Sequence, residues 1–260
     1  MNTTQKVIKA FAICLAALII LSIINGVAHL VTSAFSFNND VNINETYNSD
    51  INNIKIDVGT TNMVIKYGAT FSITAENVSK EFKIKEEGNT LVIKEKNITI
   101  FGNKKSSHTT ITIPSSLNNL SIDIGAGKLE LSDITSNNFS LNQGAGKVVI
   151  TNLISNNTTI DGGAGELHIT SSKLQNLDLD LGAGKCYYNG ILLGNNKIYQ
   201  GVGELILDLQ NDDYKFKVEK GLGSITVNGN SYSEDFEVGE GTNIIDIDGG
   251  VGSIIINTNK

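Results

Sequence analysis

The chain has 260 residues, a net charge of −7, 20 lysines and no arginine. This length holds one sizeable domain with or without an anchor, and the dispersed acidic charge argues against a nucleic-acid partner. The two cysteines, Cys14 and Cys186, lie far apart, with Cys14 in an apolar N-terminal segment, so we expect no disulfide framework.

The first feature along the chain is an apolar segment at residues 10–31. As a helix its 22 residues rise about 33 Å, enough to cross a hydrocarbon core of roughly 30 Å. Lys6 and Lys9 precede it, and the next basic residue is Lys55. The positive-inside rule therefore predicts one transmembrane helix, a short cytoplasmic tail at residues 1–9 and an extracytoplasmic remainder. An uncleaved or cleaved signal peptide is the alternative, and it exports the remainder as well.

The exported part divides by composition and pattern. Residues 32–47 form an Asn-rich linker, and residues 48–260 form the domain. Within it, residues 48–117 have strand patterns without a regular period, including a predicted hairpin turn at EEGNT, and are expected to cap the first edge of the sheet. Residues 118–230 form regular coils, and residues 231–260 form a modified terminal coil.

Gly-x-Gly turns recur through the domain from residue 125. The first glycines of the first six turns are separated by 19, 19, 19, 19 and 20 residues, and a fixed period near 20 residues is typical of solenoids. The turn glycines are Gly125, Gly127, Gly144, Gly146, Gly163, Gly165, Gly182, Gly184, Gly201, Gly203, Gly221, Gly223, Gly250 and Gly252.

Between the turns, apolar residues alternate with polar ones, which indicates strands. Leu129, Val148, Leu167, Cys186 and Leu205 occupy one equivalent inward position in successive copies. We therefore predict an all-β fold, a parallel β-helix-like solenoid with coils of about 19 residues stacked about 4.8 Å apart. Glycine is expected at the corners because a sharp corner needs positive φ or close backbone approach.

Two outward rows are candidate surfaces. Val149, His168, Tyr187 and Ile206 form a candidate contact strip, with ordinary strand-forming residues on a sheet surface as the alternative. Beside the turns, a row of mostly alternating charge predicts a solvated charge ladder. Its members are Lys128, Lys147, Glu166, Lys185 and Glu204.

The sequence predicts no catalytic residue, no bound cofactor and no metal site. His108 lies in a polar loop and His168 stands alone on a strand, so neither belongs to a recognisable triad or zinc motif. GGAGELHIT at residues 162–170 resembles the start of a calcium β-roll repeat, but Leu167 replaces its aspartate. Cys186 is expected to be an inert core residue.

The stretch ITIPSSLNNLSIDIGAGKLEL at residues 111–131, the recurring GAGK and GAGE turns and the preceding EGNTLVI resemble the bacterial "putative adhesin" family of β-strand-repeat domains. This family was once catalogued only as a domain of unknown function. The resemblance covers about residues 50–257, and the layout of anchor plus domain is similar to members from low-GC Gram-positive bacteria. It implies a β-helix-like solenoid at the cell surface, without catalytic residues to carry over.

These observations favour a non-enzymatic, membrane-anchored cell-surface solenoid that acts as an adhesin or as a structural or interaction module. Its expected partners are the membrane, through the N-terminal helix, and a surface protein or glycan. A sensor of envelope stress, working with another membrane protein, is the alternative. A β-helix enzyme acting on polysaccharide is a third interpretation, disfavoured because such enzymes generally use basic residues and the chain has no arginine.

Overall fold

The computed structural model describes residues 40–47, 50–95 and 106–259, and all the regular structure in these ranges is β-strand. No helix in this part of the chain is long and apolar enough to cross a membrane. The predicted tail and transmembrane helix, at residues 1–9 and 10–31, lie outside the described residues, as does the first part of the predicted linker.

Fifteen strands form one continuous sheet. They are β1 (Asp40–Tyr47), β2 (Asn53–Tyr67), β3 (Phe71–Ser79), β4 (Phe82–Glu87), β5 (Thr90–Glu95), β6 (His108–Ile113), β7 (Leu117–Gln175), β8 (Leu177–Leu193), β9 (Asn195–Leu209), β10 (Tyr214–Glu219), β11 (Leu222–Val227), β12 (Asn230–Tyr232), β13 (Phe236–Val238), β14 (Asn243–Asp248) and β15 (Val251–Thr258).

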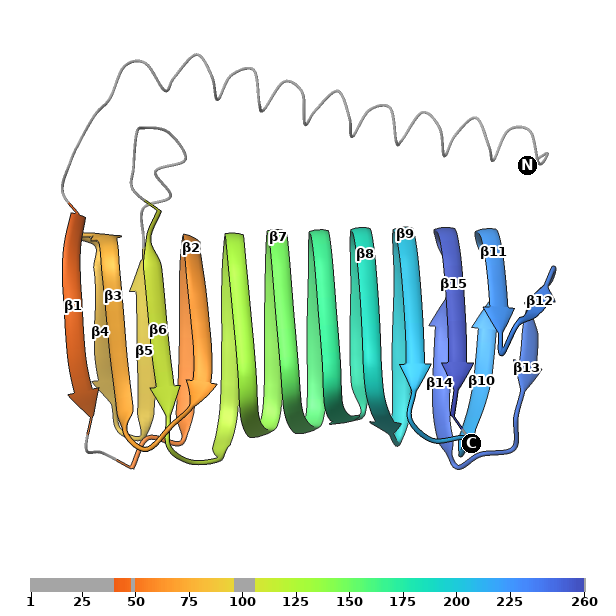
Figure 1. The fold of residues 1–260 in the computed structure, drawn as a ribbon, viewed down its shortest axis with the longest axis horizontal. Helices are drawn as coiled ribbons and strands as arrows, with labels where there is room; N and C mark the ends of the chain where they lie inside the picture. The colour runs from red at the N-terminus through yellow and green to blue at the C-terminus, as the bar shows by residue number, and fades with distance from the viewer. Residues whose placement is uncertain (1–39, 48–49, 96–105, 260) are drawn as a thin grey trace, which may run out of the picture. The chain divides into compact units, whose positions relative to one another are not determined.

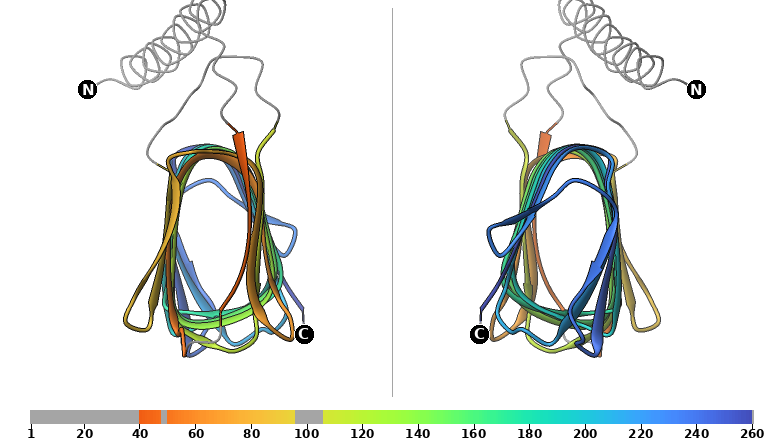
Figure 2. Two further views of the ribbon diagram at one scale, coloured as in Figure 1. Left: turned by 90° about the vertical axis from the view of Figure 1, so that its left-hand side faces the viewer. Right: turned by 90° about the vertical axis from the view of Figure 1, so that its right-hand side faces the viewer.

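The sheet is wound into a flattened tube of stacked coils (Figures 1 and 2). Strand β7 alone spans 59 residues, because its ladder continues around the corners of successive coils. Its last coil pairs in parallel with β8, placing Ile160 opposite Leu179 and Leu167 opposite Cys186, an offset of 19 residues. The predicted all-β solenoid with 19-residue coils is confirmed.

Each coil has two strand segments on opposite sides of the tube. We call the side made by residues before each Gly-x-Gly turn the first face, and the side made by residues after it the second face. The turns line one long edge, the glycine edge. The polar corners, with sequences such as Ser136-Asn137-Asn138, line the other, the asparagine edge.

The core lies between the two faces and is built from the inward residues of the alternating pattern. Leu167 is 2% exposed, stacks on Cys186 at 2%, and Cys186 stacks on Leu205 at 0%. The inward register predicted from the sequence is therefore confirmed. Because the inward side chains of each coil also pack against those of the next coil, the stack forms one continuous core.

The predicted linker is wrong at its C-terminal end, where residues 40–47 form strand β1. This strand pairs antiparallel with β3, opposite residues 71–79. Val41 and Ile43 are half-buried against the core, and the ring of Tyr47 lies 5.3 Å from that of Phe71. These three apolar side chains pack against the core and help to cover this end of the stack.

The C-terminal coils do not stack in sequence order, in contrast to the simple succession that the repeat predicts. Strands β14 and β15 lie between β9 on one side and β10 and β11 on the other, as Figure 1 shows in dark blue. The outermost positions are taken by β12 and β13, which pair antiparallel with β11 and β10. The sequence permits this because Ile225 and Ile254 are equivalent inward residues that fit either rung.

The N-terminal end has the same construction. Strand β2 pairs directly with the first coil of β7, Ile54 opposite Leu120, although 66 residues separate them. Strands β5 and β6 lie on its outer side. Antiparallel strands β4, and β3 followed by β1, then close the two faces. Both ends of the parallel stack are thus covered by antiparallel strands.

Candidate functional site

The glycine edge is built by close backbone approach between coils. A Cβ atom on either glycine of a turn would lie closer than 3.0 Å to a carbonyl oxygen of the preceding coil in the stack. The second glycine also has positive φ, 144° at Gly165. The two glycines of a turn are therefore needed for different reasons, the first for space and the second for space and conformation. Their contribution is structural.

The second face brings the predicted contact strip together. Strand pairing places His168 opposite Tyr187, and Tyr187 opposite Ile206. Because β15 is inserted beside β9, Ile255 lies opposite Ile206 and extends the row by one rung. The side chains of the strip are half-buried, and the rings of His168 and Tyr187 lie 6.1 Å apart. From here on, the contact strip means Val149, His168, Tyr187, Ile206 and Ile255.

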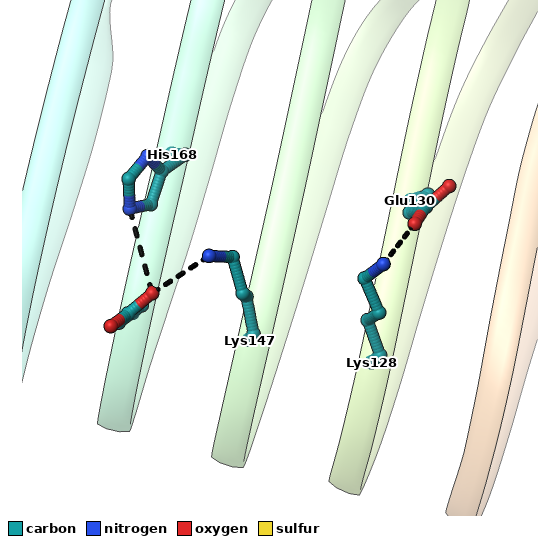
Figure 3. A network of polar contacts seen from close by, with 5 residues as sticks. Lys128, Glu130, Lys147 and His168 are labelled. Carbon is teal, nitrogen blue, oxygen red and sulfur yellow. Dashed lines mark hydrogen bonds and ion pairs between the residues drawn. The ribbon is translucent and has the colours of Figure 1, made fainter.

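A charge ladder runs beside the contact strip, at the position that directly follows each Gly-x-Gly turn. Figure 3 shows Lys128 and Lys147 of this ladder, together with His168 of the strip. Glu166 lies 2.9 Å from the Nζ atom of Lys147 and 3.7 Å from His168 Nε2, both measured from its Oε2 atom. The hydrogen bond from Lys147, followed by its charge, lowers the pKa of Glu166. On the next pair of coils, Lys185 lies 3.2 Å from Glu204.

The ladder departs from the predicted pattern at its first member. Lys128 pairs with Glu130 on its own strand, two residues along, and both side chains are about half exposed. Because every pair of the ladder is solvated, each contributes little to folding. The ladder therefore places charged side chains along one side of the contact strip.

The opposite border of the contact strip is polar as well. A hydrogen bond to Asp208 raises the pKa of Tyr187, with a smaller effect from burial. Asp208 is two residues beyond Ile206 along β9 and faces Asn189 of β8. The strip is therefore a half-buried row of aliphatic and aromatic-ring side chains with polar borders.

Reactive groups do not converge on a site in the described part of the chain. No group of three or more His, Cys, Asp or Glu side chains there could hold a metal ion. His108 begins β6, with its Nδ1 atom 3.0 Å from the Ser106 carbonyl oxygen, while His168 belongs to the contact strip. Burial raises the pKa of the Cys186 thiol to about 12, so the reactive thiolate is scarce at neutral pH.

The acidic side chains of the first face form a broken row. Asp161 and Asp180 are neighbours on adjacent coils, and the next coil places Tyr199 beside Asp180. Two like charges at rung spacing repel each other weakly in water. Nothing in this row gathers enough oxygen ligands for a calcium site.

The asparagine edge carries amide ladders that the sequence reasoning missed. Asn138 donates from Nδ2 to Oδ1 of Asn119 at 2.8 Å, and Asn157 donates to Asn138 at 2.9 Å. A second row runs beside the first, with Asn156 donating to Asn137 at 2.8 Å. The signal was present in the sequence as Ser-Asn-Asn repeated after 19 residues.

Comparison with known proteins gives a family and a fold. The Toastrack DUF4097 family matches residues 51–243. The crystal structure of a "putative adhesin" from Bacteroides fragilis is 19% identical, covers 84% of this chain and 98% of its own, and superposes with a TM-score of 0.54.

A second structure, of a "putative cell adhesion protein" from Clostridium sporogenes, is 19% identical and covers 85% of this chain and 100% of its own, with a TM-score of 0.34. No curated protein sequence matches the chain. At these identities, the likeness to the Bacteroides protein shows a shared fold.

Proposed function

The chain belongs to the Toastrack DUF4097 family, and from that membership we propose that it is a non-enzymatic interaction module of the cell surface. Its β-solenoid is held at the membrane by one N-terminal helix at residues 10–31, and the domain after it is extracytoplasmic. The module acts as an adhesin or a structural element by presenting its outer faces to a partner.

The contact strip is the observation that carries this proposal. Five rungs bring Val149, His168, Tyr187, Ile206 and Ile255 into one row, about 19 Å long at 4.8 Å per rung. A row of aliphatic and aromatic-ring side chains with charged and polar borders suits an extended partner, because contact with the aliphatic side chains and ring faces supplies affinity while the borders fix orientation. The adhesion-related descriptions of the two structural relatives are consistent with such a role.

The cavities of the described residues also favour an interaction module over an enzyme. The hollow beneath the turns, lined in part by Gln143, Leu167 and Gln200, has a volume of about 20 Å³, room for one water molecule. A wider hollow of about 440 Å³ is open and lined by Lys220, Gly221, Ser233, Glu234 and Asp235. There Asp235 accepts a hydrogen bond from the Lys220 backbone at 2.7 Å, so its carboxylate is engaged in holding the loop.

Two measurements on cells test the proposal. Protease added to cells stripped of their wall should remove the domain, and full protection would overturn the predicted orientation. A photocrosslinking residue at Tyr187 should join the chain to a discrete surface partner. The same residue at Thr159, exposed on the first face, is the matched control, and equal crosslinking from both positions would contradict a role for the strip.

A further inference from the structure

The amides of the asparagine edge have hydrogen-bonding capacity left over. A carboxamide carries two N–H donors and an oxygen with two lone pairs. One row consists of Asn119, Asn138 and Asn157. In it, each amide donates one hydrogen bond to the side-chain oxygen of the amide before it. The middle amide, Asn138, also donates to the Asn118 carbonyl oxygen at 3.4 Å, so what it keeps is one lone pair on its oxygen. In the second row, Asn156 donates one N–H group to the oxygen of Asn137 at 2.8 Å, and its other N–H group is available to a ligand.

These amides face solvent. Asn119, Asn137, Asn156 and Asn157 are exposed and Asn138 is half-buried. Hydrogen bonds between successive coils hold them in fixed orientations, so a ligand would meet an ordered array, and the amides would lose little further side-chain entropy on binding. The array is uncharged.

An exposed aromatic residue lies at the same edge as this array, at the register position of Asp133, five residues before Asn138. Tyr67 ends β2 and is 59% exposed, the highest value among the exposed large hydrophobic residues of the described chain. The preceding residue, Lys66, pairs with Ser132, so Tyr67 lies at the register position next to Asp133. Asp133 accepts a hydrogen bond from Asn152 at 2.8 Å, which continues the polar edge to the next coil.

We propose that the asparagine edge binds an extended, uncharged β-linked glycan, with one sugar ring stacked on Tyr67. The hydroxyl or acetamido groups along the chain would use the leftover donors and acceptors of the amide rows. An exposed aromatic ring offers an apolar face to the C–H surface of a sugar, and a small number of oriented polar groups supplies specificity.

Other polymers fit this edge less well. An anionic polymer gains nothing from neutral amides on a chain with a net charge of −7. A peptide strand would need unpaired backbone groups to extend the sheet, whereas the backbone of these coils is already paired with the coils on both sides. An uncharged glycan needs neither positive charge nor a free sheet edge.

This inference rests on the proposed extracytoplasmic location and names a ligand class for the surface. The test uses the full-length chain in detergent, titrated in a calorimeter with hexamers of β-1,4-linked N-acetylglucosamine and of β-1,4-linked glucose. We expect binding of at least one hexamer. A preference for the first indicates contacts from the acetamido groups, and equal binding indicates contacts from the hydroxyl groups.

Variants then locate the site. Tyr67→Ala and Asn156→Ala should each weaken binding about tenfold. Tyr199→Ala removes another exposed tyrosine, 43% exposed but on the first face, and should change binding less than about twofold. Thermal unfolding of each variant within a few degrees of wild type confirms that it is folded.

The proposal is overturned if neither hexamer binds at millimolar concentration, or if Tyr199→Ala weakens binding as much as Tyr67→Ala. These failures leave the proposed function intact when the protease and crosslinking experiments succeed. Protection of the domain from external protease would instead remove the premise that both proposals share.

Discussion

Three glycine-to-alanine substitutions separate the two reasons for glycine at the glycine edge, which are positive φ and the close approach of neighbouring coils. Gly88, in the turn between β4 and β5, has a φ of 63° and open space around the position of a Cβ atom. Gly163 lacks positive φ, but its Cβ atom would meet the carbonyl oxygens of Gly144 and Gln143. Gly165 has a φ of 144°, and its Cβ atom would meet the carbonyl oxygen of Gly146.

The expected costs follow from these environments. Gly88→Ala carries only the left-handed backbone penalty, about 1–2 kcal/mol. Gly163→Ala carries only the steric penalty of forcing two coils apart, about 1–3 kcal/mol. Gly165→Ala carries both a backbone penalty of about 1–3 kcal/mol and the steric penalty, so we expect about 2–6 kcal/mol. At about 2–4 °C per kcal/mol for a domain of this size, Gly165→Ala should lower the melting temperature most, by roughly 4–24 °C.

Thermal unfolding followed by circular dichroism measures all three variants under one condition. The reasoning requires Gly165→Ala to be the most destabilised and Gly163→Ala to be destabilised although no φ change is involved. A melting temperature for Gly163→Ala equal to that of wild type would refute the close-approach argument, because it would mean that neighbouring coils can separate without cost.

Two further predictions concern the core and metal ions. Leu167→Asp places a carboxylate beside Cys186, where no partner is available, and should cost several kcal/mol, enough to unfold a marginal domain. Thr151→Asp, an exposed position, should leave the melting temperature within a few degrees, and equal effects would contradict the inward register. Full-length chain in excess chelator should keep its β-rich circular dichroism spectrum, since the core is aliphatic; a loss of signal that calcium restores would establish a metal-dependent fold.

The repeating part of the fold was predictable because two periodicities agree. Alternation within a strand fixes which side chains point inward, and the 19-residue spacing of the turns fixes which of them stack. The pairing of Leu167 with Cys186 follows from these two facts alone. The hairpin at EEGNT was predictable for a local reason, because Gly88 supplies the positive φ that the turn needs.

The order of the last coils was not predictable, because it depends on a choice between equivalent partners. Leu205 could stack on Ile225 or on Ile254, and both are aliphatic residues in the same position of a coil. The choice depends on whether residues 210–213 connect β9 to the adjacent rung or to the rung beyond it. The pattern of inward residues does not indicate which of these two paths the chain takes.

The candidate surfaces were predictable to different degrees. Four residues of the contact strip follow from the repeat, whereas Ile255 joins them only through the insertion of β15. The asparagine rows had a sequence signal in the repeated Ser-Asn-Asn, but its meaning depends on side-chain hydrogen bonds between coils. Tyr67 has no repeat equivalent, so only its exposure identifies it.

The insertion of β14 and β15 beneath β10 and β11 has a consequence for the order of assembly. A chain grows from its N-terminus, so residues 214–227 emerge before the coil that separates them from β9. If residues 214–227 paired with β9 as soon as they emerged, they would occupy the position beside β9 that β14 and β15 take in the folded protein. The coil formed by β10 and β11 can therefore reach its final position only after residues 243–258 have been synthesised. The C-terminal end thus folds as one cooperative unit after synthesis, and not coil by coil during synthesis.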